Sequence, residues 1–273
     1  MLEIDTWPEL HDPLLVTALR GWVDAGEAGA LAATLLTDRL DDSQVFGRYD
    51  LSDLVDLQQT RPMVSLVDGA TRRISWPSVE FTSGRAHRDV VVCSGPEPSL
   101  RWPSFVGELT DVAQRLGVTQ AFTLGGMPAV ASHRRPIGVL ATATSHSLAQ
   151  EIGAIRTDYT GPTGVQTVLQ LSLGEAGIPA VGLWAQVPHY VAGNASPPAA
   201  RALLERVGEL TGVHVDLSDL DEETTSYNEK VEEGLADRPD VADLVQAIED
   251  QSVEEVSGDA LAAEIERFLR EQQ

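Results

Sequence analysis

The feature that most constrains the fold is a regular alternation of strand-like and helix-like segments between residue 14 and His214. Apolar runs of strand length occur at residues 14–19, 45–49, 89–94, 121–124, 137–144 and 178–187. Runs with helical spacing occur at residues 27–40, 104–116, 145–152, 165–173 and 197–210. This alternation is typical of an α/β fold with a mixed, mainly parallel sheet and helices on both faces. It predicts a core domain over residues 1–215.

Two segments depart from the alternation. Residues 63–67 and 73–76 flank the turn Asp68-Gly69-Ala70-Thr71, which predicts a β-hairpin. After residue 215, glycine becomes rare and strand-like runs end. Residues 220–235, 241–248 and 260–269 read as three acidic helices with apolar stripes, so we expect residues 216–273 to form an acidic helical extension. We favour an extension that packs on the core domain over one that binds a partner.

Charge and composition restrict the class of protein. The chain of 273 residues has a net charge of −23, of which residues 216–273 hold −15, with 19 acids and 4 bases. Such a charge disfavours nucleic acids and anionic membranes as partners. Apolar runs are too short to cross a bilayer, and residues 1–10 lack the pattern of a targeting signal. With Cys93 as the sole cysteine, these features predict a cytoplasmic protein without intramolecular disulfides.

The richest motif lies at residues 158–191. Tyr159, Gly161 and Gly164 belong to a glycine-lined turn at the start of the predicted helix 165–173, and His189 follows the predicted strand 178–187. In open α/β sheets, loops at the ends of strands project from a rigid scaffold and often bind ligands or partners. We expect these residues to line a loop that contacts a ligand or a partner.

Two other glycine-rich segments follow predicted strands. Asp24 and Gly26 lie between a predicted strand and a predicted helix. We favour a turn and helix cap for them over a role in the wall of a pocket. Gly125 and Gly126 end the strand at 121–124, and we favour a tight turn there over an anion-binding nest of backbone N–H groups. Neither segment matches a dinucleotide or phosphate-loop fingerprint.

No pattern of catalytic or metal-binding residues stands out. Cys93 lies inside a β-branched strand and reads as a core residue. The six histidines lack zinc-site spacing, so we expect no metal and no catalytic residue. In so acidic a chain, the basic cluster Ser132-His133-Arg134-Arg135 is expected to form salt bridges within the chain or between subunits. A catalytic role for His133 is the alternative.

Taken together and in this order, the segments GWVDAGEAG, LGGMPAV, DYTGPTG and GIPAVGLWAQVPHYV resemble the proteasome assembly chaperone 2 family, specifically its bacterial and archaeal members. The acidic helical extension resembles that of actinobacterial members. The resemblance covers about residues 10–215. It implies a fold similar to that of nucleoside phosphorylases, with a partly closed mixed sheet. The family's characterised eukaryotic members are chaperones without catalytic residues, and its prokaryotic members tend to form homo-oligomers.

We therefore expect a non-enzymatic, chaperone-like protein that binds other proteins and needs no cofactor. The alternative is an enzyme or binding protein whose glycine-rich loops form a pocket for a small, nucleoside-like molecule. The resemblance implies a homo-oligomer, most simply a trimer, and Trp184, Tyr190 and Val191 form an aromatic-apolar cluster suited to its interface. An open apolar patch would favour the chaperone, whereas a pocket with convergent acid, base and anion nest would favour the enzyme.

Overall fold

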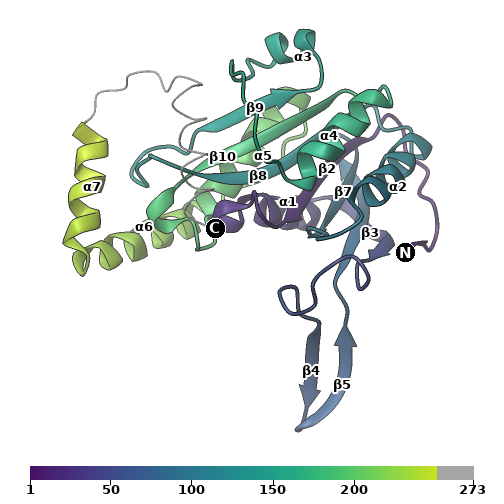
Figure 1. Cartoon of the computed structure of the whole chain (residues 1–273), viewed down its shortest axis with the longest axis horizontal. Helices are drawn as coiled ribbons and strands as arrows, with labels where there is room; N and C mark the ends of the chain where they lie inside the picture. The colour runs from purple at the N-terminus through teal and green to yellow at the C-terminus, as the bar shows by residue number, and fades with distance from the viewer. Residues whose placement is uncertain (251–273) are drawn as a thin grey trace.

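Eight strands form one continuous sheet in the computed structural model, which describes residues 1–250 (Figure 1). Across the sheet, the strands follow the order β1 (Leu2–Ile4), β3 (Asp41–Asp50), β6 (Ser78–Ala86), β7 (Arg88–Pro96), β2 (Leu14–Arg20), β8 (Gln120–Ala129), β10 (Ala180–Pro188) and β9 (Val139–Ala143). The α/β architecture with a mixed sheet and flanking helices is as the alternation predicts.

The sheet is not mainly parallel, which corrects the sequence-based expectation. The central strands β7, β2, β8 and β10 are parallel to one another, but β1, β3, β6 and β7 pair antiparallel, and so do β9 and β10. The apolar pattern does not predict strand β6, because its apolar residues are interrupted by Glu80, Thr82, Ser83 and Gly84. The likeness to nucleoside phosphorylases stays a prediction.

Strand β2 shows how the core is divided between the two faces. Leu14, Val16 and Ala18 pack in one apolar cluster with helices α1 (Ala28–Asp38) and α5 (Pro197–Thr211). Leu15 and Leu19, which alternate with them, pack in another with α2 (Trp102–Arg115) and α4 (Val165–Glu175). Because successive side chains of a strand point to opposite faces, a run that is buried on both faces needs helices on both.

Short helices lie in the connections between these elements. They are η1 (Ala25–Glu27) before α1, α3 (His146–Glu151) after β9, and η2 (His189–Val191) after β10. Within residues 1–250, none of the helices combines the length and the apolar composition needed to cross a membrane.

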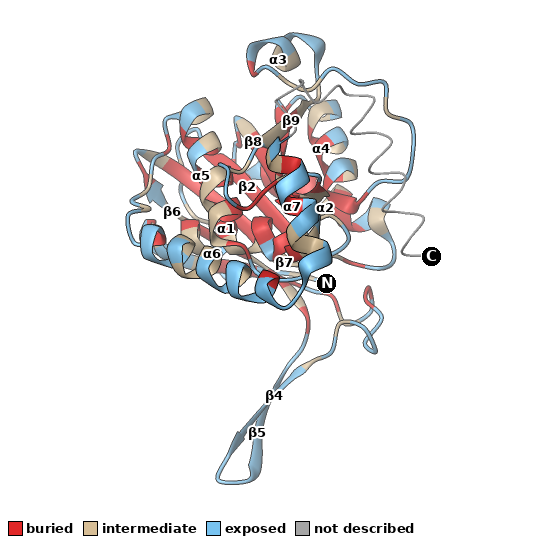
Figure 2. Cartoon of the chain, turned by 90° about the vertical axis from the view of Figure 1, so that its left-hand side faces the viewer, coloured by how far each residue is buried: buried red, intermediate tan, exposed pale blue. Residues whose placement is uncertain are grey.

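Helices α6 (Leu220–Ala236) and α7 (Pro239–Asp250) lie where the sequence predicts the first two acidic helices, whereas the predicted helix at 260–269 falls outside the described residues. Their buried side chains include Leu220, Leu235, Val245 and Ile248, and α6 packs on α5. The outer face of α6 is exposed (Figure 2). Ion pairs tie these helices to the core: Arg39–Asp219, Arg201–Asp221, Arg134–Glu232 and Arg135–Glu249.

A hairpin stands away from the body of the molecule (Figures 1 and 2). Its strands β4 (Met63–Val67) and β5 (Ala70–Ser75) form a separate two-stranded sheet in which every residue is exposed. The predicted hairpin is confirmed, but the turn is tighter than expected: Asp68 and Gly69 adopt φ of 50° and 74°, and β5 begins at Ala70. We call residues 61–76 the arm.

Truncation tests the predicted boundary at residue 215. We expect a 1–215 chain to fold cooperatively, because every strand within residues 1–250 and the helices that cover both faces of the sheet precede the cut. It should melt below the full chain, since it loses the ion pairs to α6 and α7 and the burial of side chains such as Leu220 and Leu235, worth about 1.5–3 kcal/mol each. Calorimetry checks this. A 1–215 chain without a cooperative transition would place α6 and α7 in the main core.

Candidate functional site

Four segments that are distant in the sequence meet to form a groove of about 530 Å³. They are the loop after β2, the end of β8, the segment from β9 through residue 164, and helix α4 with β10 beneath it. None of the groove's lining residues carries a charge: Trp22, Val23, Gly126, Met127, Pro128, Leu140, Thr142, Ala143, Thr144, Ile155, Thr157, Tyr159, Pro162, Thr163, Gly164, Thr167, Val168, Gln170, Leu171 and Trp184. We call this the uncharged groove.

Only some of the residues that the sequence singles out line the uncharged groove. Gly126, Tyr159 and Gly164 line the uncharged groove, with the buried Trp184 among its walls. Gly161 lies in the same loop, where an added Cβ would come within 2.3 Å of the Tyr159 hydroxyl oxygen, and that hydroxyl donates to the Pro162 carbonyl. Asp24, Gly26 and Gly125 are not among the residues that line it.

Gly125 and Gly126 are strand residues, which corrects the expected turn. Strand β8 continues through both to Ala129 and stays paired with β10. A Cβ on Gly126 would lie 2.2 Å from the Ala25 carbonyl oxygen, and one on Gly125 would lie 2.4 Å from that of Val23. The glycines therefore allow the loop after β2 to rest directly on β8. The backbone that approaches them is the protein's own and not a ligand's.

Asp24 caps the first helix. Its carboxylate accepts the backbone N–H of Gly29 at 2.7 Å and that of Ala30 at 3.4 Å, near the start of α1. Burial raises the pKa of Asp24 from 3.8 to about 6, and the two N–H donors act against that rise. Next to it, Gly26 has a φ of 66° and donates its N–H to the Ala192 carbonyl at 2.7 Å. Both residues serve the turn and cap that the sequence favours.

Glu97, which the sequence does not single out, occupies the N-terminus of α4. One carboxylate oxygen accepts the Val165 N–H at 2.8 Å, and the other accepts the Trp22 N–H at 2.9 Å. A helix N-terminus is a ready site for an anion, and here the anion is a side chain of the same chain. Glu97 follows β7, so it holds the loop after β2 and the start of α4 together. No local sequence signal distinguishes it from other loop acids.

Gln166 fills the crevice between two central strands. Strands β2 and β8 pair as far as Thr17 and Thr123. Beyond that point, the Gln166 amide accepts the Leu19 N–H at 3.2 Å and donates to the Leu124 carbonyl at 2.8 Å. Open α/β sheets commonly bind ligands where neighbouring strands separate at their carboxyl ends. In this protein, a buried side chain of α4 takes that position.

The histidines lie outside the uncharged groove. His189 Nδ1 is 3.2 Å from the Ala129 carbonyl oxygen. The buried His133 contacts the Tyr190 hydroxyl at 2.8 Å and Glu232 at 3.0 Å. Arg134 binds Glu232 through two N–H groups, and this contact lowers the pKa of Glu232 to about 2. The basic cluster is therefore an internal salt-bridge partner for α6 and α7, which is one of the roles that the sequence leaves open.

The predicted interface cluster has little free surface in the single chain. Trp184 and Val191 are buried, and Tyr190 is half-buried with its hydroxyl bound at His133. Cys93 is fully enclosed, and burial raises the pKa of its thiol. Among residues 1–250, no three His, Cys, Asp or Glu side chains are grouped as they would be around a metal ion.

The geometry defines an α/β protein with an uncharged surface groove, and comparison with known proteins supplies the family. The model of the PAC2 family matches residues 18–235, and the chain belongs to this family. A PAC2 family protein from Streptomyces avermitilis is 38% identical with a TM-score of 0.78, and the match covers 86% of this chain and all of that one.

Two solved structures from Mycobacterium tuberculosis are also similar. The proteasome-assembly chaperone homologue Rv2125 is 36% identical with a TM-score of 0.78, and the match covers 85% of this chain and 99% of that one. Rv2714, a protein of unknown function, is 29% identical with a TM-score of 0.83, and the match covers 92% and 90% of the two chains. The chain is thus similar to actinobacterial members of the family over most of its length.

The raised pKa of Asp24 predicts a pH dependence of stability. The folded chain binds a proton at Asp24 more tightly than the unfolded chain does, so stability decreases as pH rises from about 4 to above 6. Relative to Asp24→Asn, which does not titrate, the wild type should lose on the order of 3 kcal/mol of unfolding free energy over this interval. Denaturant titrations at several pH values measure the difference. Parallel pH profiles for the two proteins would contradict it.

The double role of Glu97 predicts a loss of stability on its removal. Glu97→Ala should lower the free energy of unfolding by about 1–3 kcal/mol, because two backbone N–H groups lose a charged acceptor. Glu97→Gln should lose part of this stability, because its single amide oxygen can accept only one of the two N–H groups. Glu9→Ala, at an exposed acid in another loop, should change little. Urea titration of the three variants checks this. Equal effects at Glu97 and Glu9 would refute the role assigned to Glu97.

Proposed function

We propose that this chain is a non-enzymatic, chaperone-like protein of the cytoplasm that binds an apolar segment of another protein in the uncharged groove. The observation that carries the proposal is the lining of that groove, which contains no charged residue in a chain of net charge −23. Depletion of charged residues and enrichment of aromatic ones mark the core of protein–protein interfaces. Trp22, Tyr159 and Trp184 supply the aromatic side chains here.

The polar groups near the groove support the same conclusion. The Asp24 carboxylate is bound at the start of α1, the Glu97 carboxylate at the start of α4, and the Gln166 amide between β2 and β8. Each holds backbone groups of its own chain. A convergent acid, base and anion nest is what the enzyme alternative needs, and the lining residues do not offer it.

The relatives support a chaperone-like role without specifying a client. Rv2125, more than a third identical to this chain, is described as a proteasome-assembly chaperone homologue. We extend to this chain the chaperone-like class of activity, and we do not extend to it the assembly of a proteasome. The proposal includes a homo-oligomer in solution, with a trimer as the expected form.

A small apolar molecule is the second candidate occupant. The volume of the groove, about 530 Å³, lies within the range of ligand pockets, and aromatic walls suit a flat, nucleoside-like ring. The two candidates differ in what the purified protein retains: a protein segment in the first case and a metabolite in the second.

A matched pair of surface leucines tests the groove. Leu171 lines it and is 58% exposed, whereas Leu100 lies outside it and is 57% exposed. We expect Leu171→Glu to reduce the protein captured from native lysate by at least about tenfold, because it places a charge in an apolar interface. Leu100→Glu should capture as much as the wild type. Mass spectrometry of retained proteins and metabolites gives the readout.

Both variants should keep the wild-type melting temperature, since both leucines are exposed. Equal protein capture by the two variants would contradict a client site in the groove. Loss of a bound metabolite from Leu171→Glu alone, with protein capture unchanged, would favour the small-molecule alternative.

A further inference from the structure

The uncharged groove has an apolar segment of its own chain within reach. Residues 251–273, which lie outside the described residues and which we call the tail, contain the predicted helix at 260–269. Its large apolar residues are Leu261, Ile265, Phe268 and Leu269. Offsets of four, seven and eight residues from the first place these side chains on one face of a helix. A helix with such a stripe can dock in an apolar groove.

The tail begins close to the uncharged groove. Glu249, at the end of α7, pairs with Arg135 at 3.0 Å, and its carbonyl oxygen accepts a second N–H of Arg135 at 2.8 Å. Arg135 lies five residues before Leu140, which lines the groove, so the backbone limits their separation to about 18 Å. Residues 251–259 connect α7 to the predicted helix, and nine residues can span about 30 Å. The tail is therefore long enough to reach the groove.

Charge restricts where the tail can bind. It has six acids and two arginines, a net charge of −4. Helix α6 has six acids and one lysine, and α7 has four acids without a base, so their charges are −5 and −4. Repulsion between like charges disfavours packing of the tail along these helices. The lining residues of the uncharged groove carry no charge, so they do not repel the tail.

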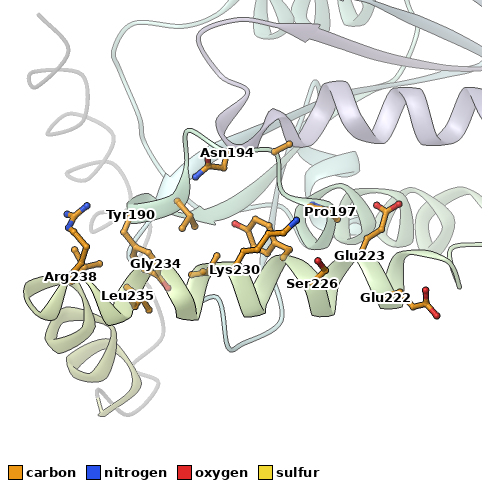
Figure 3. Close-up of a pocket in the computed structure, with 15 residues that line it drawn as sticks. Tyr190, Asn194, Pro197, Glu222, Glu223, Ser226, Lys230, Gly234, Leu235 and Arg238 are labelled. Carbon is orange, nitrogen blue, oxygen red and sulfur yellow. The ribbon is translucent and has the colours of Figure 1, made fainter.

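A second groove, which we call the α6 groove, is less suited to the tail (Figure 3). It has a volume of about 790 Å³ and lies between α6 and the segment from η2 to the start of α5. Glu223 and Lys230 project from α6 on its side (Figure 3). An apolar stripe that covered these two side chains would remove their charges from water, which costs free energy. The walls of the uncharged groove have no charge to desolvate.

We propose that the apolar stripe of the tail docks in the uncharged groove of its own chain and competes there with clients. It covers Leu171 and Trp22, two apolar side chains of the groove that are exposed. Because the tail is tethered, its effective concentration at the groove is on the order of millimolar, so weak contacts suffice. A client that binds more tightly displaces the tail and covers the groove more completely. This inference rests on the proposed function.

The tail also defines the class of client. A segment that replaces it presents the same kind of surface, an amphipathic helix with apolar residues three and four positions apart. Only chains whose groove is open bind such a client, so the apparent dissociation constant increases as the open fraction decreases. Weakening the tail contact therefore increases client binding without a change in the groove itself.

Cross-linking tests the tail contact without a client. Leu171 lines the uncharged groove, Leu100 is equally exposed outside it, and Ser226 lines the α6 groove. We compare three full-length variants: L171C/F268C, L100C/F268C and S226C/F268C. A short bis-maleimide should link the first pair within one chain at least about tenfold faster than the other two, because docking raises the local concentration of residue 268 at the groove. Cys93 is buried and does not compete for the reagent.

Mass spectrometry of the linked peptides gives the rates. Equal rates for the three pairs, a faster reaction at Ser226, or links formed only between separate copies would each overturn the proposal.

Capture from native lysate tests the competition. Phe268→Glu places a charge in the stripe and should increase the protein captured by at least about threefold, because the groove is open in more of the chains. Ala263→Glu is the matched control, since it adds the same charge on the opposite face of the predicted helix. It should capture as much as the wild type. An increase for Phe268→Glu no larger than that for Ala263→Glu would contradict the competition.

The two experiments separate this proposal from the client site. Rapid cross-linking of L171C/F268C, with equal capture by Leu171→Glu and Leu100→Glu, would retain the tail contact and reject the client site. Equal cross-linking rates, with capture lost only in Leu171→Glu, would retain the client site and reject the tail contact.

Discussion

The contact on which the site depends is the approach of one backbone to another at Gly125 and Gly126. The carbonyl oxygens of Val23 and Ala25 lie where side chains on these glycines would begin. The loop after β2 can therefore rest on β8, which brings Trp22 and Val23 to the uncharged groove and sets Asp24 at the start of α1. A single Cβ at either glycine would separate the loop from the sheet, so two walls of the groove depend on residues without side chains.

The protein's own polar side chains take the positions where an α/β sheet usually accepts ligands. Glu97 binds the N-terminus of α4, and Gln166 lies between β2 and β8 where they separate. With these positions occupied by the protein's own side chains, the surface left open at this end of the sheet is uncharged and rich in aromatic, aliphatic and threonine residues. A surface of this kind gains free energy by burying apolar area, which is what the proposed recognition of another protein requires.

Local sequence patterns predicted much of the fold because they report local physics. The central strands β2, β7, β8 and β10 and their helices follow from apolar periodicity, and the arm follows from its turn residues. Apolar periodicity does not predict the antiparallel strand β6, because polar residues interrupt its apolar run. It predicts a turn at Gly125–Gly126, where strand β8 continues, because a glycine pair usually ends a strand. The roles of Glu97 and Gln166 could not be predicted, since each depends on partners far along the chain.

The central claim is that the uncharged groove holds protein. Amide hydrogen exchange of the chain, alone and in complex with a client isolated on it, tests this most directly. If a client occupies the groove, exchange should slow on binding at residues 155–171 and at Trp22 and Val23, with no change in the arm. Unchanged exchange in those segments, with protection elsewhere on the molecule, would contradict it.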